Sequence, residues 1–156
     1  MTETYPDSEA ATRAHAKRVA QLLAPIAADL IQRGIEHDES KTQDPEKAIF
    51  DEYTWKLKDS TYGSDEYKQF LAEMKPALDH HYANNRHHPE HFPDGVEGMT
   101  LVDLMEMLAD WRAAGERHAD GSMARSLALQ QGRFGIGDQL QFILENTAKF
   151  YGWVTR

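Results

Sequence analysis

The sequence contains no cysteine, and this absence excludes several kinds of site at once. Disulfide scaffolds, thiolate zinc fingers, iron–sulfur clusters and cysteine nucleophiles all require thiols. Long apolar runs are missing too, because no stretch approaches the roughly 20 residues of a membrane span. The N-terminal region has no apolar core of the kind found in signal peptides. We therefore expect a cytoplasmic protein that has no membrane partner.

Basic residues are scarce relative to acidic ones. The chain has 17 Lys and Arg against 26 Asp and Glu, a formal net charge of -9. Binding to long nucleic acid needs a basic face with interleaved aromatic residues, and no such stripe is visible. With 156 residues, 40% of them hydrophobic, the chain is expected to form a single domain over residues 1–156. A homo-oligomer is compatible with this composition.

Strand patterns are also lacking, since no run of β-branched residues alternates with period two for more than a few positions. Apolar residues recur instead at helical spacing. We expect an all-α fold of about six helices, over residues 8–33, 45–57, 64–81, 101–117, 122–130 and 138–150. Pro25 is expected to bend or split the first helix, and Pro76 to kink the third.

The helix expected over residues 101–117 has an apolar side and an acidic side. The apolar side, expected in the core, consists of Leu101, Leu104, Met105 and Leu108. The acidic side consists of Asp103, Glu106 and Asp110. The acidic side is either exposed to solvent or, because Met107 and Ala114 share its arc, buried against a metal pocket. We expect Asp110 to face a polar pocket.

Histidine is the residue in excess. Five of the eight histidines fall between His80 and His91, whereas solvated faces usually carry lysine and glutamate. Neutral imidazole is the commonest metal ligand, so the run indicates a metal site. His80 with His87, and His81 with His88, are each seven residues apart and can share a helix face. Pro89 turns His88 off the helix, which favours the pair His81 and His88 without excluding the other pair.

The order of these elements along a helical chain resembles that of the HD-domain superfamily of metal-dependent phosphohydrolases. In that superfamily a histidine on an early helix, an adjacent His-Asp pair and a later aspartate converge on a divalent ion. The resemblance implies an HD-domain-like helical bundle. The metal ligands it implies are His15, His37, Asp38, His81, His88 and Asp110, with Asp103 as the alternative terminal ligand.

The chain is also similar to a family of small bacterial and phage proteins that has no assigned activity. The strings that carry this resemblance are His37-Asp-Glu-Ser-Lys41, Asn85-Arg-His-His-Pro-Glu-His91 and Met99-Thr-Leu-Val-Asp-Leu-Met-Glu-Met-Leu-Ala-Asp-Trp111. It extends from about His15 to Thr147. No activity can be transferred from this family, so the expected chemistry depends on the HD pattern.

The HD resemblance implies hydrolysis of a small phosphorylated substrate, with a nucleotide as the first choice. One or two ions of Mn, Fe, Co, Ni or Zn suit mixed imidazole and carboxylate ligands, and Mg is also allowed. Asp38 would bridge two ions if two are present, and Lys41 with Arg86 would bind the phosphate. Glu106 would orient the nucleophilic water or accept a hydrogen bond from a ligating imidazole.

Three other interpretations use the same residues differently. An HD-type di-iron oxygenase has the same ligand order and more histidines. A non-catalytic binding protein would keep the metal for stability alone, in a closed site. An all-α nucleotide pyrophosphatase would use Glu-x-x-Glu helix pairs, which Glu66–Glu73 and Asp103–Glu106 match only loosely and which leave the histidines without a role.

Overall fold

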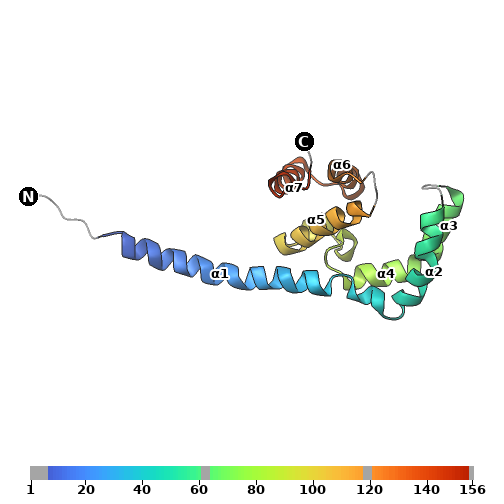
Figure 1. Ribbon diagram of the computed structural model, residues 1–156, viewed down its shortest axis with the longest axis horizontal. Coiled ribbons are helices and arrows are strands. Elements are labelled where there is room, and N and C mark those ends of the chain that lie inside the picture. The colour runs from blue at the N-terminus through green and yellow to red at the C-terminus, as the bar shows by residue number, and fades with distance from the viewer. Residues whose placement is uncertain (1–6, 61–63, 118–120, 155–156) are drawn as a thin grey trace, which may run out of the picture. The chain divides into compact units, whose positions relative to one another are not determined.

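The protein is all-α, as the sequence predicts. The computed structural model describes residues 7–60, 64–117 and 121–154, and these ranges hold seven α-helices, three short 3-10 helices and no strand. Figure 1 shows the helices in chain order. None of them combines the length and apolar character that crossing a bilayer requires. Contacts divide the chain into two compact units, Met1–Ile35 and Glu36–Arg156. The single domain expected over residues 1–156 stays a prediction, and each unit is described by itself.

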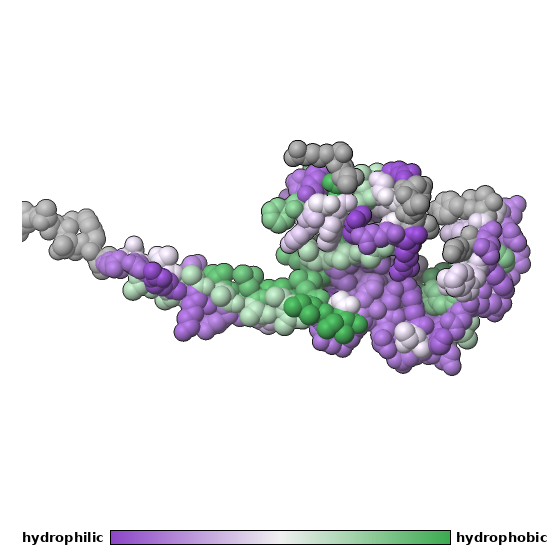
Figure 2. All heavy atoms as spheres, viewed as in Figure 1, coloured by the Kyte–Doolittle hydropathy of each residue, from purple (hydrophilic) through white to green (hydrophobic). Residues whose placement is uncertain are grey.

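The first unit is essentially one helix, α1 (Glu9–Glu36), of 28 residues. Pro25 lies inside it, so the expected break into two helices is wrong. A proline removes one backbone hydrogen bond, and the remaining bonds of so long a helix keep it continuous. Figure 2 shows apolar residues gathered along α1.

The second unit begins with the 3-10 helix η1 (Glu39–Thr42) and helices α2 (Glu46–Asp59), α3 (Asp65–Glu73) and α4 (Lys75–Asn84). Helix α2 packs against both α4 and η1. The single kinked helix predicted around Pro76 is in fact two helices. Pro76 lies in the first turn of α4, where its missing N–H group leaves no hydrogen bond unmade. Two further 3-10 helices, η2 (Pro89–His91) and η3 (Gly95–Gly98), lie between α4 and the helix that begins at Leu101.

The hydrophobic core of this unit lies among the last three helices, α5 (Leu101–Glu116), α6 (Met123–Phe134) and α7 (Asp138–Phe150). Thr100 begins α5 with a capping box that includes Asp103. Gly135 ends α6 at φ 63, a left-handed conformation that glycine adopts without steric strain. The buried core residues are Met107, Leu108, Trp111, Met123, Leu127, Ile136, Leu144 and Ala148.

Helix α5 is rotated relative to the sequence prediction. Leu108 is fully buried as expected, but Leu101 is 78% exposed. Leu104 and Met105 are only half-buried. Met107 and Asp103, from the side predicted to be acidic, are fully buried. An acidic residue is tolerated there because its carboxylate is neutralised and hydrogen-bonded, which hydrophobic periodicity alone does not reveal.

Candidate metal centre

The His37-Asp38 pair lies directly after α1. Asp38 has φ 60 and ψ 16, a left-handed conformation that is uncommon for a residue with a side chain. The left-handed turn at Asp38 separates α1 from η1, and it places the Asp38 carboxylate near the start of the second unit. Its two oxygens have different surroundings. Oδ2 accepts a hydrogen bond from Lys41 Nζ at 2.6 Å, while Oδ1 is buried.

The histidine run is split between α4 and the segment that follows it. His81 comes from the last turns of α4, whereas His87 and His88 lie between Asn85, which ends the helix, and Pro89, which begins η2. His81 and His87 are almost fully buried and His88 is half-buried. Helical periodicity therefore does not govern the direction of His87 or His88.

These three imidazoles meet at Asp38. The Nε2 atoms of His81 and His87 lie 3.3 and 3.4 Å from Asp38 Oδ1. His88 Nε2 lies 2.9 Å from His81 Nε2. One ligand atom from each of the four residues falls within 4.8 Å of all the others. Ligand atoms held about 2.1 Å from an ion at the corners of a tetrahedron are about 3.4 Å apart, so this spacing suits a small divalent ion.

Carboxylates hold the opposite edges of two of these rings. His81 Nδ1 lies 2.9 Å from Glu46 Oε2, and His87 Nδ1 lies 3.1 Å from Glu106 Oε1. A carboxylate at Nδ1 fixes the tautomer with a proton on Nδ1, which leaves the Nε2 lone pair for a metal. Glu46 is fully buried and also accepts a hydrogen bond from Ser40 Oγ. The carboxylate–imidazole arrangement is typical of protein metal sites.

Two polar atoms in the centre are left without a hydrogen bond. Asp38 Oδ1 and His87 Nε2 are buried and have no hydrogen-bond partner among the described residues. Leaving a buried polar group unpaired costs about 1–3 kcal/mol, and more for a charged group. Both atoms belong to the four-residue group, where a bound cation would pair with them at once. The residues present therefore fit a metal ion.

The pKa values of the histidines differ according to their surroundings. Burial lowers the pKa of His88 to about 3, so its imidazole is neutral and ready to ligate. Burial also opposes charge on His87, but the nearby carboxylates of Asp38 and Glu106 outweigh it and raise the pKa. Burial likewise opposes charge on Asp38, yet His81, His87 and Lys41 hold its pKa well below the usual range.

His37 is placed beside the same centre with both ring nitrogens next to carboxylates. Its Nδ1 lies 3.0 Å from Glu106 Oε1, and its Nε2 lies 3.4 Å from Asp110 Oδ1. Hydrogen bonds to Asp110 and Glu106 raise the pKa of His37 to about 10. His37, His87 and Glu106 form a second close group of candidate ligands. Among the described residues, His37, Asp38 and Asp110 do not form a group of that kind.

The cluster contains three of the six ligands suggested by the sequence, Asp38, His81 and His88, and adds His87. His81 and His88 are both in the cluster, as favoured. His87, which the spacing made an alternative, is there too, because the two pairs are not exclusive once the helix ends at Asn84. His80 points elsewhere, with its Nδ1 2.7 Å from Glu46 Oε1.

His15 is an exposed residue of α1, in the first unit. It is not in either close group of candidate ligands among the described residues. The early-helix histidine implied by the HD resemblance stays a prediction.

Arg86 and Asp103 are used structurally rather than at the centre. Arg86 Nε and Nη2 donate to the two oxygens of Asp103 at 3.1 and 3.0 Å. The same carboxylate accepts hydrogen bonds from Thr100 at the start of α5. This ion pair engages Arg86, and Asp103 is not in either close group of candidate ligands among the described residues.

Glu46 is the member of the centre that the sequence did not indicate. It follows Pro45 in the first turn of α2, a position where acidic residues are common because they interact favourably with the helix dipole. Neither its spacing nor its neighbours distinguish it from such a residue. Glu106, in contrast, was indicated by the sequence. Its Oε1 lies beside the Nδ1 atoms of His37 and His87, which fits the expected role as a hydrogen-bond acceptor for a ligating imidazole.

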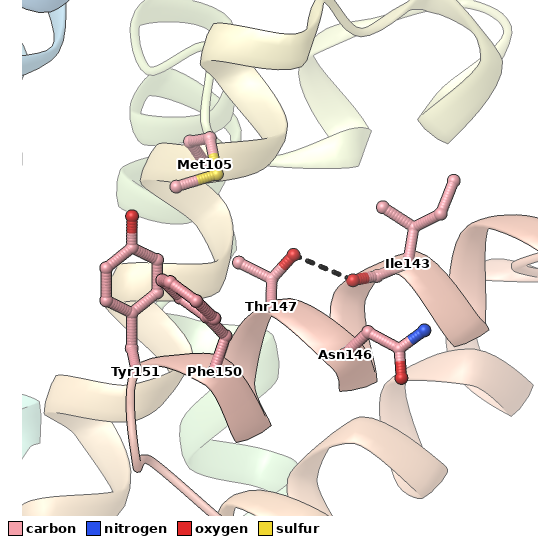
Figure 3. Close-up of a pocket in the computed structure, with 6 residues that line it drawn as sticks. All are labelled: Met105, Ile143, Asn146, Thr147, Phe150 and Tyr151. Atoms are coloured by element: carbon pink, nitrogen blue, oxygen red, sulfur yellow. Dashed lines mark hydrogen bonds between the residues drawn. The ribbon is translucent and has the colours of Figure 1, made fainter.

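A separate pocket of about 440 Å³ lies between α5 and α7 (Figure 3). It is lined by Met105, Ile143, Asn146, Thr147, Phe150 and Tyr151. Thr147 Oγ1 donates to the Ile143 carbonyl at 2.7 Å, so its hydroxyl is engaged within α7. The lining has no carboxylate or imidazole, and the pocket therefore offers no metal ligand or acid–base group of that kind.

Comparison with known proteins gives a family but no activity. No curated protein and no solved structure matches the chain. Residues 4–150 match a family described as a family of unknown function, DUF5662. The matched region includes the candidate ligands from His37 to Asp110 and almost the whole described chain. The protein therefore belongs to the DUF5662 family.

Proposed function

We propose that the protein is a metal-dependent phosphohydrolase of the HD type that acts on a small phosphorylated substrate, with a nucleotide as the first choice. The observation that carries the proposal is the gathering of His81, His87 and His88 around Asp38, whose buried Oδ1 has no hydrogen-bond partner among the described residues. Three imidazoles and one carboxylate suit Mn, Fe, Co, Ni or Zn better than calcium.

The residues divide the work of such a site between them. A divalent ion, when bound, lowers the pKa of a coordinated water and offsets charge on a phosphoryl oxygen. His81, His87, His88 and Asp38 would hold it, while Glu46 and Glu106 fix the orientation of two of the imidazoles.

Lys41 is the cation best placed to meet a substrate phosphate. Its ammonium is 2.6 Å from Asp38 Oδ2 and its side chain is 34% exposed, so an anion can reach it from solvent. His37 and Asp110 flank the same side, with side chains 25% and 22% exposed. Four protein ligands complete a tetrahedral ion, so a water would bind at this accessible edge to an ion that takes five or six ligands, such as Mn or Fe. With such an ion the edge supports a catalytic rather than a closed structural site.

The test is a screen of the purified protein, loaded in turn with Mn, Fe, Co, Ni and Zn, against nucleotides and simple phosphoesters. Phosphate release that disappears in Asp38→Asn and His88→Ala, and persists in His91→Gln, is the expected result. His91 is the matched control because its Nδ1 bonds to the Tyr82 carbonyl, outside the cluster.

Two results would count against hydrolysis. Metal retained with no phosphate released from any substrate would indicate a metal-stabilised binding protein. Oxygen consumption that depends on iron, again without phosphate release, would indicate an oxygenase of the same ligand order.

A further inference from the structure

The two oxygens of Asp38 serve different partners. Oδ1 faces the Nε2 atoms of His81 and His87 and lacks a hydrogen bond, whereas Oδ2 accepts one from Lys41 Nζ at 2.6 Å. In a two-ion site, a bridging carboxylate gives one oxygen to each ion. Here the second oxygen already has a positive charge beside it.

We propose that the centre holds one divalent ion, on the Oδ1 side of Asp38, and that the ammonium of Lys41 takes the place of a second cation on the Oδ2 side. This inference deepens the proposed function and rests on the same metal site. It assigns to Lys41 the charge-offsetting task that a second ion performs in two-metal hydrolases.

The residues available for a second ion support a single-ion centre. His37, Asp38 and Asp110 are not gathered as the first set is, and the second close group, His37, His87 and Glu106, shares His87 with the first set. A neutral imidazole has a single lone pair, so His87 can serve only one of two ions. His37 Nε2 is 3.7 Å from Asp38 Oδ2, and its Nδ1 is occupied by Glu106 at 3.0 Å. Two ligand atoms on opposite sides of an ion are at most about 4.2 Å apart at the usual bond lengths. The ligand atoms of His37, Asp38 and Asp110 would therefore have to move closer together before they could bind an ion.

The position of Lys41 is defined by its surroundings as well as by Asp38. It lies three residues after Asp38, in the last turn of η1, so the short helix brings its side chain back to the carboxylate. Its ammonium also lies 5.2 Å from the centre of the Phe50 ring, within the range of a cation–π interaction. These two contacts hold the charge in place while leaving part of it open to an incoming phosphate.

The experiment counts ions rather than turnover. Protein stripped with a chelator is titrated with Mn²⁺ in a calorimeter, and the bound metal is measured by elemental analysis after desalting. Wild type should bind one ion per chain, and His88→Ala should bind none. Lys41→Met, which keeps the length of the side chain without its charge, should expose Oδ2 and admit a second ion that binds more weakly than the first.

Lys75→Met is the matched control, because Lys75 makes an exposed ion pair with Asp79 at 2.6 Å outside the centre. It should bind one ion, as wild type does. Two ions in wild type, or one ion in Lys41→Met, would overturn the inference while leaving the metal-dependent hydrolase intact. No ion in wild type would refute the metal centre itself and the inference with it.

Discussion

At the scale of single residues, the carboxylates beside the Nδ1 atoms of His81 and His87 determine that the Nε2 atoms face the centre. The density of histidines in the sequence predicted a cluster, and the structure gathers three of them with Asp38. The sequence did not predict Glu46, because an acidic residue in a first helical turn is ordinary. Which nitrogen of a ring faces the centre depends on contacts such as Glu46 with His81, which join segments far apart in the chain.

Glu46→Gln tests this support. Glutamine keeps the shape of the side chain but removes the charge that holds the proton on His81 Nδ1. We expect metal affinity to fall by about 10- to 100-fold, the usual effect of losing a carboxylate behind a ligating histidine. Competition with a chromogenic chelator measures it. Glu145→Gln, on α7, is the control, and equal affinity in both variants would show that Glu46 does not support the ligand.

The ion-free protein should be most stable near pH 6.5, the ordinary pKa of histidine. The pKa of His37 is raised to about 10, so its stabilising contribution is complete below 6.5 and is lost as the pH rises through 10. The pKa of His88 is lowered to about 3, so stability is also lost as the pH falls from 6.5 through 3.

Urea unfolding with a chelator present, at a series of pH values on both sides of 6.5, measures this dependence. His37→Gln should reduce the loss of stability above pH 6.5 (the alkaline limb), because glutamine does not titrate. His91→Gln should leave the alkaline limb unchanged. An alkaline limb that is as steep in His37→Gln as in wild type would contradict the assignment.

At the scale of helices, sequence patterns predicted where elements lie better than how they face. All six expected helices begin within a few residues of the expected positions, because caps and apolar spacing are local signals. The effect of Pro25 was overestimated, since tertiary context and helix length decide whether one lost bond breaks a helix. The rotation of α5 was missed because Arg86, distant in sequence, neutralises Asp103.

Leu108 and Leu101 test the observed rotation of α5. Leu108 is fully buried, and Leu108→Ala should reduce the free energy of unfolding by about 2–5 kcal/mol. Leu101 is 78% exposed, and Leu101→Ala should change it by less than about 0.5 kcal/mol. Urea denaturation of the two variants gives both values. Similar losses in both would favour the rotation predicted from the sequence.

At the scale of the whole molecule, the four clustered ligands belong to the unit Glu36–Arg156. They come from the turn after α1, from α4 and from the segment before η2, so a bound ion would join parts of the chain that folding must first bring together. Sequence order predicted the participants from His37 onward. It also suggested His15, which lies in the first unit and stays a prediction.

His15→Ala should therefore leave the metal content of the full chain unchanged, because none of the four clustered ligands lies in the first unit. Elemental analysis beside wild type and His88→Ala measures this. Loss of metal from His15→Ala comparable to that from His88→Ala would make His15 a ligand and restore the HD pattern in full.

At position 38 the residue that suits metal binding differs from the residue that suits folding, because the backbone of Asp38 is left-handed. For a residue with a Cβ atom this conformation costs roughly 1–2 kcal/mol of folding free energy, whereas for glycine it does not. In a library randomised at position 38, selection for heat resistance in the presence of a chelator should enrich glycine. Selection of the same library for retention of metal should return aspartate.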